Sequence, residues 1–472
     1  MDTFEELPGS GKYVYFIGVG GISMSSMAEI LKSRGFSVAG SDMAEGEQVS
    51  MLRRLGVPVF IGHDAGNLDK IGAGKIGLVV NTAAVKPDNP EMVKARALGL
   101  PILERAPVLG KMASWYENSI GIAGMHGKTT TTSMTAQILL DDGRDPTISV
   151  GGVMRSIGGN FRVGRPDLFV FEACEYCDSF LSFYPKYSAI LNIDADHLDY
   201  FKDLAHIRRS FRRYAENAGH TLVINAAIPS WAELVSGLPA RAVTFKADGG
   251  PGLNSGFEAD FSAGNIAFGS SGASFEIREK GEEPRVIRLK TGGAHNVENA
   301  LAAFALCASI GVSRERAALS LENFENPARR FEIKGNYRGA VIADDYAHHP
   351  TEIRTALAAA RSGGWKRILC LFQPHTYTRT AALFDEFAAA FENADEAAFV
   401  DIYAARERDT GIASSRELAS AVAKTGRPAA YLKSFGEAAG YYRENLREGD
   451  LLITMGAGDV YKIGEKILDD KE

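Results

Sequence analysis

A glycine-rich stretch, residues 119–133, has the composition of a phosphate-binding loop. It reads SIGIAGMHGKTTTTS, an apolar run followed by glycines, one lysine and four threonines. After a strand, such a turn directs backbone N–H groups and the positive end of the next helix toward phosphate oxygens. Gly124 and Gly127 allow close backbone approach; Lys128 can neutralise phosphate charge, and Thr129 can ligate Mg²⁺. The pattern predicts an ATP site.

The loop departs from the strict P-loop pattern at one position. That pattern has a further glycine five residues before Gly127, where this chain has Ile122. A tight strand-to-helix turn with an exposed lysine is therefore the alternative interpretation. The order of strand, Gly-Lys-Thr and helix favours nucleotide binding.

A second glycine-rich turn, FIGVGGISM at residues 16–24, follows the first apolar run. It nearly matches the dinucleotide fingerprint, but Ser23 stands at the third glycine position and Gly21 is additional. An NAD site is one interpretation. The same N–H groups would hold the diphosphate of UDP equally well, and Asp42, at the end of the next apolar run, can accept from a ribose or uracil donor.

Other side chains suited to nucleotide chemistry stand at the ends of apolar runs. Glu172 and His197 each follow such a run, so both are expected at the carboxyl edge of a parallel sheet, where ligands bind. From the residues alone, His197 fits a helix cap or a core histidine as well as a metal ligand. Asn296 and Asn299, at i and i+3, can bond the adenine edge or satisfy the start of a helix.

Parallel sheets covered by helices would position these residues at strand ends. The sequence fits this arrangement, because strand-length apolar runs alternate with amphipathic segments almost throughout. Three such series predict an α/β chain of three domains: an N-terminal Rossmann-like domain (1–108), a central P-loop ATPase-like parallel sheet (109–325) and a C-terminal Rossmann-like domain (326–472). Expected strands are 13–17, 37–39, 78–81, 119–123, 168–172, 188–192, 341–344, 367–372, 397–400 and 451–454. Hairpins are expected within 243–289 and a helix over 296–308.

The bulk composition is that of an ordinary globular protein. At 472 residues the chain is expected to form several domains, and its net charge of −7 argues against nucleic-acid binding through a broad basic surface. No apolar run is long enough to span a bilayer, and the acidic start lacks a signal-peptide core. Four scattered cysteines fit a reducing compartment, and the lone pair Cys174 and Cys177 is a weak metal or redox signal. We expect a cytoplasmic protein.

Seven segments together carry a resemblance to a known family. They are AGMHGKTTT (123–131), FEACEYCDSF (171–180), NIDADHLD (192–199), HNVEN (295–299), RRFE (329–332), DDYAHHP (344–350) and PHTYTRT (374–380). In this order they resemble the amino-acid ligases of peptidoglycan synthesis and their folylpolyglutamate synthetase relatives. The resemblance covers nearly the whole chain.

The resemblance implies an ATP- and Mg²⁺-dependent ligase that joins L-alanine to UDP-N-acetylmuramate through an acyl phosphate, acting as a monomer or homodimer. Its implied ATP-binding residues are Gly124, His126, Gly127, Lys128, Thr129, Thr130, Asn296, Asn299, Arg330 and Asp344. Its implied UDP-sugar residues are Gly18, Gly20, Gly21, Ile22, Ser23, Asp42, Thr82 and Ala83, and its implied metal ligands are Thr129, Glu172 and His197.

The implied catalytic residues are Lys128, His348 and Arg379. His348 is a candidate base for the amine, although His348 or the adjacent His349 can instead cap the helix after Pro350. Arg379 can pair with a substrate carboxylate. Thr376 stands where many relatives have arginine, so no charged contact is assigned there.

The helix after His197 carries arginines where several relatives have a carbamylated lysine, so that modification is not predicted. A ligase for a preformed murein tripeptide, an NAD-dependent dehydrogenase and a non-catalytic nucleotide-binding module are the alternatives. Domain closure is expected about hinges near 107–119 and 323–329.

Overall fold

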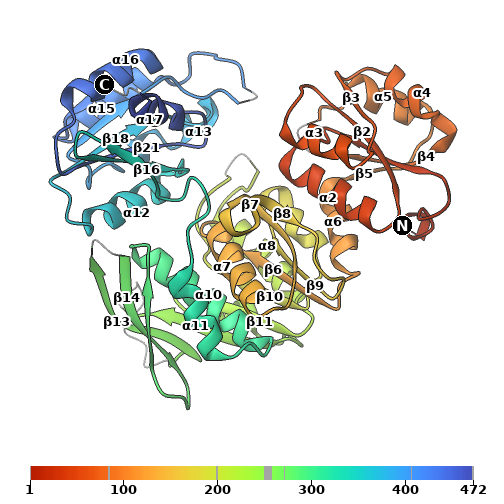
Figure 1. The fold of residues 1–472 in the computed structure, drawn as a ribbon, viewed down its shortest axis with the longest axis horizontal. Helices are drawn as coiled ribbons and strands as arrows, with labels where there is room; N and C mark the ends of the chain where they lie inside the picture. Colours follow the sequence, from red (N-terminus) through yellow and green to blue (C-terminus); the bar gives the residue numbers. More distant parts are fainter. Residues whose placement is uncertain are drawn as a thin grey trace. The chain divides into compact units, whose positions relative to one another are not determined.

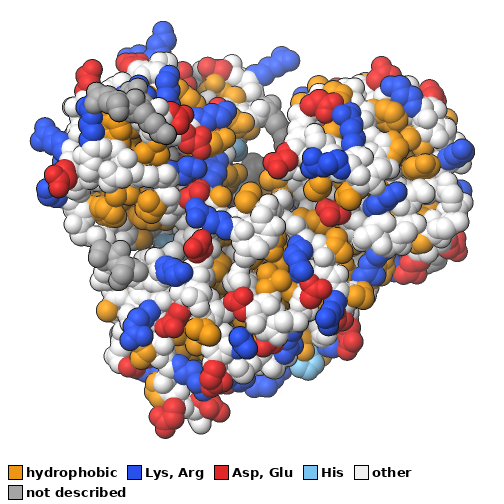
Figure 2. Space-filling view, in the orientation of Figure 1, with side chains coloured by type: hydrophobic (Ala, Val, Ile, Leu, Met, Phe, Trp, Pro, Cys, Tyr) orange, Lys and Arg blue, Asp and Glu red, His pale blue; other side chains and the backbone are white. Residues whose placement is uncertain are grey.

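The computed structural model describes residues 2–82, 85–197, 200–248, 258–269, 272–405 and 407–469, and strands alternate with helices along the chain (Figure 1). Contacts divide the chain into two compact units, residues 1–245 with 302–316 and residues 246–301 with 317–472. Among the described residues, no helix combines the length and apolarity needed to cross a membrane. On the face seen in Figure 2, acidic and basic side chains are interspersed.

The first unit begins with a five-stranded parallel sheet in the order β3-β2-β1-β4-β5. Its strands are β1 (Tyr13–Ile17), β2 (Ser37–Asp42), β3 (Val59–Ile61), β4 (Ile76–Asn81) and β5 (Ile102–Glu104). The helices are α1 (Asp2–Glu5), α2 (Ile22–Ser33), α3 (Glu47–Arg54), α4 (Gly66–Ile71), α5 (Pro90–Ala97) and α6 (Arg105–Ala113), with a 3-10 turn η1 (Ala73–Lys75). The central strand β1 is buried along almost its whole length, as expected for a sheet covered on both faces.

The second sheet has ten strands, in the order β15-β14-β13-β12-β11-β10-β6-β9-β7-β8. The strands from β12 to β7 in this order run parallel; they are β6 (Asn118–Ala123), β7 (Thr147–Met154), β9 (Leu168–Glu172), β10 (Tyr187–Ile190), β11 (Thr221–Asn225) and β12 (Arg241–Ala247). β8 (Gly159–Arg162) pairs antiparallel with β7. The other elements are α7 (Lys128–Asp141), α8 (Leu204–Glu216), α9 (Trp231–Val235), η2 (Arg155–Ile157) and η3 (Tyr176–Ser182).

Helix α6 packs closely against the second sheet's η3. A β-carbon at Gly110 would overlap the carbonyl oxygen of Ser182, so this contact requires glycine. Val108, Leu109 and Met112 are buried in a core that continues into the second sheet. Most of the segment 107–119, where a hinge is expected, is therefore helix packed by apolar burial.

Antiparallel hairpins and a long helix complete the central region. The hairpin strands are β13 (Phe261–Gly269), β14 (Gly272–Glu279) and β15 (Arg285–Leu289). They are followed by α10 (Ala294–Ser309) and α11 (Arg314–Asn323). The expected hairpins and the expected helix over 296–308 are both confirmed.

The C-terminal sheet has the order β16-β17-β21-β18-β19-β20, parallel except for the edge strand β16. Its strands are β16 (Glu332–Tyr337), β17 (Ala340–Asp345), β18 (Arg367–Phe372), β19 (Glu396–Phe399), β20 (Ala429–Tyr431) and β21 (Asp450–Met455). Its helices are α12 (Pro350–Arg361), α13 (Tyr377–Ala382), α14 (Phe384–Ala388), α15 (Ser415–Lys424), α16 (Phe435–Asn445) and α17 (Tyr461–Leu468). The α/β class with three sheets, predicted from the alternating pattern, is confirmed.

A fully buried carboxylate, Glu91, organises one face of the N-terminal sheet. Its two oxygens accept hydrogen bonds from the Tyr15 and Ser41 hydroxyls at 2.7 Å and from the Asn67 amide at 3.1 Å. Nδ1 of His63 lies 2.7 Å from the same carboxylate. The four partners come from β1, β2, α4 and the loop between β3 and α4. Glu91 therefore joins elements that are distant in sequence.

Replacing Glu91 with alanine is expected to lower the free energy of unfolding by about 3–5 kcal/mol, because several buried polar groups lose their partner at once. Glu91→Gln should cost much less, since Ser41 and His63 can accept from an amide. The matched control is Glu45→Ala, which removes an exposed ion pair with Arg53 and should cost less than about 1 kcal/mol. Equal effects of the two alanine variants in urea unfolding would contradict this role.

Candidate active site

The glycine-rich loop connects β6 to α7 as predicted. Gly127 is the N-cap of α7 with φ of 81°, and Gly124 has φ of 150°, conformations that favour glycine. A β-carbon at Gly124 would lie 2.9 Å from Cβ of Leu191, so glycine is also required by packing. Thr129 and Thr130, in the first turn, are buried. The helix thus presents its positive end and its first N–H groups at the end of a parallel strand.

Lys128 is held in place by its own loop and by one carboxylate. Its Nζ donates to the carbonyl oxygens of Gly124 at 2.6 Å and Met125 at 3.0 Å, and lies 2.8 Å from Oε2 of Glu175. Burial lowers the pKa of Lys128, but Glu175, Cys174 and Glu172 together outweigh it and the net shift is upward. Lys128 is therefore a charged ammonium at neutral pH, poised for phosphate.

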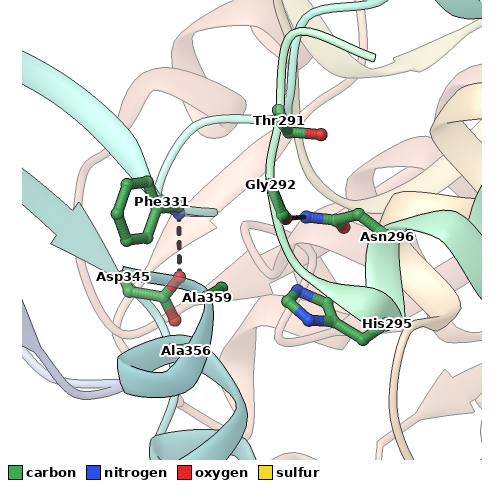
Figure 3. A pocket seen from close by; sticks show the side chains of 8 residues that line it. All are labelled: Thr291, Gly292, His295, Asn296, Phe331, Asp345, Ala356 and Ala359. Atoms are coloured by element: carbon green, nitrogen blue, oxygen red, sulfur yellow. Dashed lines mark hydrogen bonds between the residues drawn. The ribbon is translucent and has the colours of Figure 1, made fainter. Parts of the chain in front are cut away.

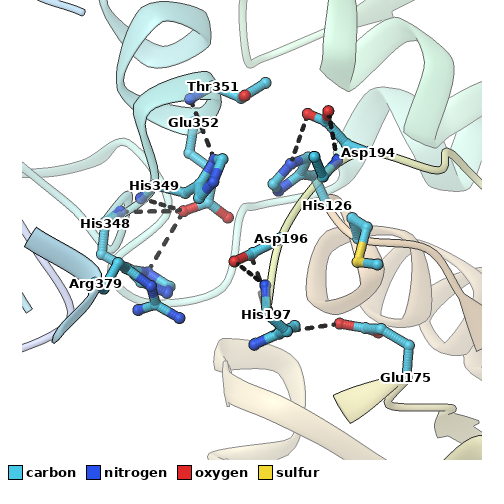
Figure 4. A network of polar contacts seen from close by, with 12 residues as sticks. His126, Glu175, Asp194, Asp196, His197, His348, His349, Thr351, Glu352 and Arg379 are labelled. Atoms are coloured by element: carbon cyan, nitrogen blue, oxygen red, sulfur yellow. Dashed lines mark hydrogen bonds and ion pairs between the residues drawn. The ribbon is translucent and has the colours of Figure 1, made fainter. Parts of the chain in front are cut away.

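An asparagine clamps the backbone of the loop. Oδ1 of Asn192 accepts from the His126 N–H at 2.8 Å, and its Nδ2 donates to the His126 carbonyl at 3.0 Å. Nε2 of His126 lies 3.4 Å from Asp194 (Figure 4). Asn192 follows β10, so two neighbouring strand ends fix the loop.

The predicted metal ligands are Thr129, Glu172 and His197. Nε2 of His197 lies 3.3 Å from Glu175 (Figure 4), which also holds Lys128, and the Glu172 carboxylate accepts from the Gly151 N–H. The described residues contain no group of three or more His, Cys, Asp and Glu side chains able to hold a metal alone. A hydroxyl, a carboxylate and an imidazole fit Mg²⁺ that takes its remaining ligands from phosphate and water.

A small, partly open pocket lies within the second unit (Figure 3). Its lining includes residues of the α10 start, the loop before β16, the end of β17 and helix α12; they are Thr291, Gly292, His295, Asn296, Phe331, Asp345, Ala356 and Ala359. Asn296 is buried and its Nδ2 donates to the Gly292 carbonyl at 2.8 Å. The pocket has the mixed apolar and polar lining of a nucleoside site.

The two neighbouring aspartates of β17 lie in different surroundings. Asp345 lines the pocket, whereas the predicted ATP residue Asp344 is fully buried and accepts from Arg329 at 2.9 Å and Thr454 at 2.7 Å. Successive side chains of a strand point to opposite faces, which explains why only one of the two reaches the pocket. Asp345 therefore lines this pocket, and the contact of Asp344 with ATP stays a prediction.

Two ionisable groups of the pocket have shifted pKa values. Burial raises the pKa of Asp345 to about 6, partly offset by the charge of Arg330. Burial, reinforced by Arg330, lowers the pKa of His295 to about 4. Arg330, a predicted ATP residue, thus acts electrostatically on the pocket. Asn299 is buried one turn after Asn296 in α10 but does not line the pocket.

The shift of His295 predicts a pH-dependent contribution to stability. His295 binds a proton near pH 6.5 in the unfolded chain and only near pH 4 in the folded chain. The free energy of unfolding therefore decreases as pH falls between these values. Relative to His295→Gln, wild type should lose about 2 kcal/mol of unfolding free energy between pH 7.5 and 5. Urea unfolding at the two pH values measures the difference, and a pH-independent difference would contradict it. Asp345 titrates in both proteins, so its contribution cancels in the difference between them.

The predicted base His348 precedes α12, while its neighbour His349 is the helix cap (Figure 4). The ring of His349 accepts a hydrogen bond from the Thr351 N–H, and the Glu352 side chain accepts one from the His349 N–H. Together these two contacts form a capping box. Nδ1 of His348 lies 3.0 Å from the Tyr346 carbonyl and 3.4 Å from Glu352. A proton on Nδ1 leaves the lone pair on Nε2, the state a base requires.

Arg379 lies in the first turn of α13, with Nη1 3.5 Å from Nδ1 of His375. Glu407 accepts from the N–H groups of Tyr377 and Thr378 and so fixes the start of this helix. Thr376, the position where relatives often have arginine, has φ of 67°. The segment is therefore anchored through backbone contacts.

Most N–H groups of the N-terminal glycine turn already donate to acceptors within the protein. Gly18 and Val19 donate to the Ser41 carbonyl at 2.8 and 2.9 Å, and Gly20 donates to the Asp42 carboxylate at 2.8 Å. Asp42 thus accepts a hydrogen bond from the turn, and its contact with a ribose or uracil donor stays a prediction. A β-carbon at Gly20 would lie 2.8 Å from that carboxylate, so glycine is required.

The remaining predicted UDP-sugar residues follow this turn or β4. Gly21 precedes α2, and Ile22 and Ser23 occupy its first turn, where N–H groups have no intrahelical acceptor. Thr82 directly follows β4, and Ala83 lies outside the described residues. An anion at this edge would meet the start of α2.

Sequence reasoning missed Glu175, Asn192 and Arg105. Glu175 and Asn192 lie inside motifs already recognised, so their positions after β9 and β10 were the available signal. Arg105 lies outside every motif and is found only through its contact with Ser23 at 3.0 Å.

Comparisons with known proteins cover the whole architecture. Three family descriptions match: "Mur ligase family, catalytic domain" over residues 13–117, "Mur ligase middle domain" over 122–307 and "Mur ligase, glutamate ligase domain" over 329–458. UDP-N-acetylmuramate–L-alanine ligases from Acetivibrio thermocellus and Agathobacter rectalis are 46% and 47% identical, covering 98% and 97% of this chain and 97% of each relative.

Solved structures agree in fold. The UDP-N-acetylmuramate-alanine ligase of Thermotoga maritima has a TM-score of 0.78 at 29% identity, covering 97% of this chain and 98% of that one. A murein peptide ligase from Psychrobacter arcticus has a TM-score of 0.70 at 23% identity over 97% and 98% of the two chains, a likeness of fold alone. With all three domains matched and near-full-length identity well above 40%, the chain belongs to the Mur ligase family.

Proposed function

We propose that this chain is the ATP-dependent ligase that joins L-alanine to the carboxylate of UDP-N-acetylmuramate in peptidoglycan precursor synthesis. One observation carries the proposal: relatives named for this reaction are 46–47% identical over essentially the full length of both chains. The charged Lys128 at the start of α7 supports ATP use independently. The reaction takes place in the cytoplasm, and the four free cysteines suit a reducing compartment.

The chemistry requires activation of a carboxylate, because its oxygen is a poor leaving group. A carboxylate oxygen of the muramate attacks the γ-phosphorus of ATP, and the bond to the β–γ bridging oxygen breaks, giving an acyl phosphate and ADP. The neutral amine of L-alanine then attacks the acyl carbon, and phosphate leaves with the C–O bond electrons. One proton is released from the amine.

The chain's own residues hold and neutralise the phosphates. The N terminus of α7 and the Lys128 ammonium bind the β- and γ-phosphates, and Glu175 keeps Lys128 oriented. Thr129, Glu172 and His197 would hold Mg²⁺, which would supply further neutralisation of phosphate charge. The pocket with Asn296 and Asp345 takes the adenosine end.

The amine substrate is handled by the C-terminal domain. His348, with its Nδ1 directed at the Tyr346 carbonyl, accepts the amine proton on Nε2. Arg379 pairs with the alanine carboxylate. The diphosphate of the nucleotide sugar binds at the start of α2 in the N-terminal domain.

A ligase for a preformed murein tripeptide is the second candidate, since a murein peptide ligase shares the fold. Phosphate release from ATP with UDP-N-acetylmuramate distinguishes the two across a panel of amino acids and the tripeptide. L-Alanine should give the highest kcat/KM. Preference for the tripeptide, or no amine-dependent turnover, would overturn the proposal.

A further inference from the structure

Arg105 lies at the ligand-binding edge of the N-terminal sheet and is not among the predicted site residues. It is the first residue of α6 and directly follows β5, so it stands at the carboxyl end of the parallel strands. Its Nη1 donates to Oγ of Ser23 at 3.0 Å. Ser23 is the second residue of α2, so the guanidinium lies beside the first turn of a second helix.

The electrostatics of this position are unfavourable for a cation on its own. The N termini of α2 and α6 both carry partial positive charge, and neither helix has an acidic residue in its first turn. Glu104, the N-cap of α6, is exposed and makes no capping hydrogen bond. Over the part of the chain that the structure describes, Arg105 forms no ion pair. An anion is the partner that this arrangement lacks.

The glycine turn alone does not supply enough donors for a diphosphate. The N–H groups of Gly18, Val19 and Gly20 already donate to Ser41 and Asp42. The first N–H groups of α2 remain, and these are few for a group with two or three negative charges. A fixed guanidinium next to them would provide the missing charge and two parallel donors.

We propose that the Arg105 guanidinium, together with the start of α2, binds the diphosphate of the nucleotide-sugar substrate. This assignment rests on the proposed function and makes Arg105 a substrate-binding residue of that reaction. Ser23 holds the guanidinium in the orientation that the diphosphate needs.

Inhibition of ligation by UDP and by uridine, each competing with UDP-N-acetylmuramate, tests the assignment in the full-length chain. Arg105→Met should weaken inhibition by UDP about 10- to 100-fold and leave inhibition by uridine unchanged. The KM for UDP-N-acetylmuramate should rise similarly, with kcat and the KM for ATP within about threefold. The values for Arg105→Lys should lie between those of wild type and Arg105→Met, because an ammonium point charge replaces the two parallel donors of the guanidinium.

Arg96→Met is the matched control, since Arg96 is an arginine of the same domain that donates to the Pro87 carbonyl on the surface. It should change none of these values. Unchanged inhibition by UDP in Arg105→Met would overturn the inference, and parallel loss for UDP and uridine would assign Arg105 a structural role instead. Wild type that neither ligates nor binds UDP would overturn the proposed function itself.

Discussion

Replacing Lys128 with alanine is expected to lower kcat for ligation at least about 100-fold, because single-group losses at a transferring phosphoryl commonly cost 10²- to 10³-fold. The KM for UDP-N-acetylmuramate should change little. Steady-state phosphate release measures both. Activity above about a tenth of wild type would count against Lys128 as the phosphate cation.

The structure requires a control for stability in this experiment. Lys128→Ala leaves the Glu175 carboxylate, only 1% exposed, with the His197 ring at 3.3 Å as its remaining close partner. Lys128→Ala/Glu175→Gln removes that buried charge and should recover stability without recovering activity. Lys111→Ala, which breaks a surface pair with Glu5, should leave kcat at the wild-type value.

Replacing Glu172 with alanine should produce the second large effect. We expect the Mg²⁺ concentration for half-maximal activity to rise at least about tenfold and kcat to fall about 100-fold, since a carboxylate is the strongest ligand in this donor set. Affinity for UDP should stay the same, because the nucleotide sugar is assigned to another domain. Activity titrated with MgCl₂ and UDP inhibition give the two readouts.

Glu172→Gln separates charge from structure in that experiment. The amide oxygen still accepts from the Gly151 N–H, so the β7 edge keeps its contact. If Glu172 acts through the metal, the glutamine variant should resemble the alanine variant in its Mg²⁺ requirement. Equal loss of Mg²⁺ response and UDP affinity would show that the two roles are not divided between the domains.

Local patterns predicted the elements that carry chemistry. The glycine loop, strands β1, β9 and β18 and the helix α10 follow from short-range composition, because turn glycines and apolar periodicity act within a few residues. Strand β10 ends at Ile190, two residues before the expected end, because Asn192 leaves the strand to clamp His126. Thus the motif was recognised, but its internal geometry was not.

Contacts between distant segments could not be predicted in the same way. The pairing of Lys128 with Glu175 and of Arg105 with Ser23 depends on how separate strand ends meet. Which of Asp344 and Asp345 lines the pocket depends on strand register, which a one-residue shift reverses. The packing of the segment near residue 107, where a hinge is expected, depends on a partner surface that the sequence does not reveal.

The acyl-phosphate route, the central claim, is tested most directly by following the carboxylate oxygen. UDP-N-acetylmuramate labelled with ¹⁸O in its muramate carboxylate is incubated with ATP, Mg²⁺ and L-alanine, and the products are analysed by mass spectrometry. The account predicts one ¹⁸O atom in each released phosphate, none in ADP, and one ¹⁸O retained in the new amide. Phosphate free of label, with the second ¹⁸O released in a nucleotide or in water instead, would contradict the acyl-phosphate route.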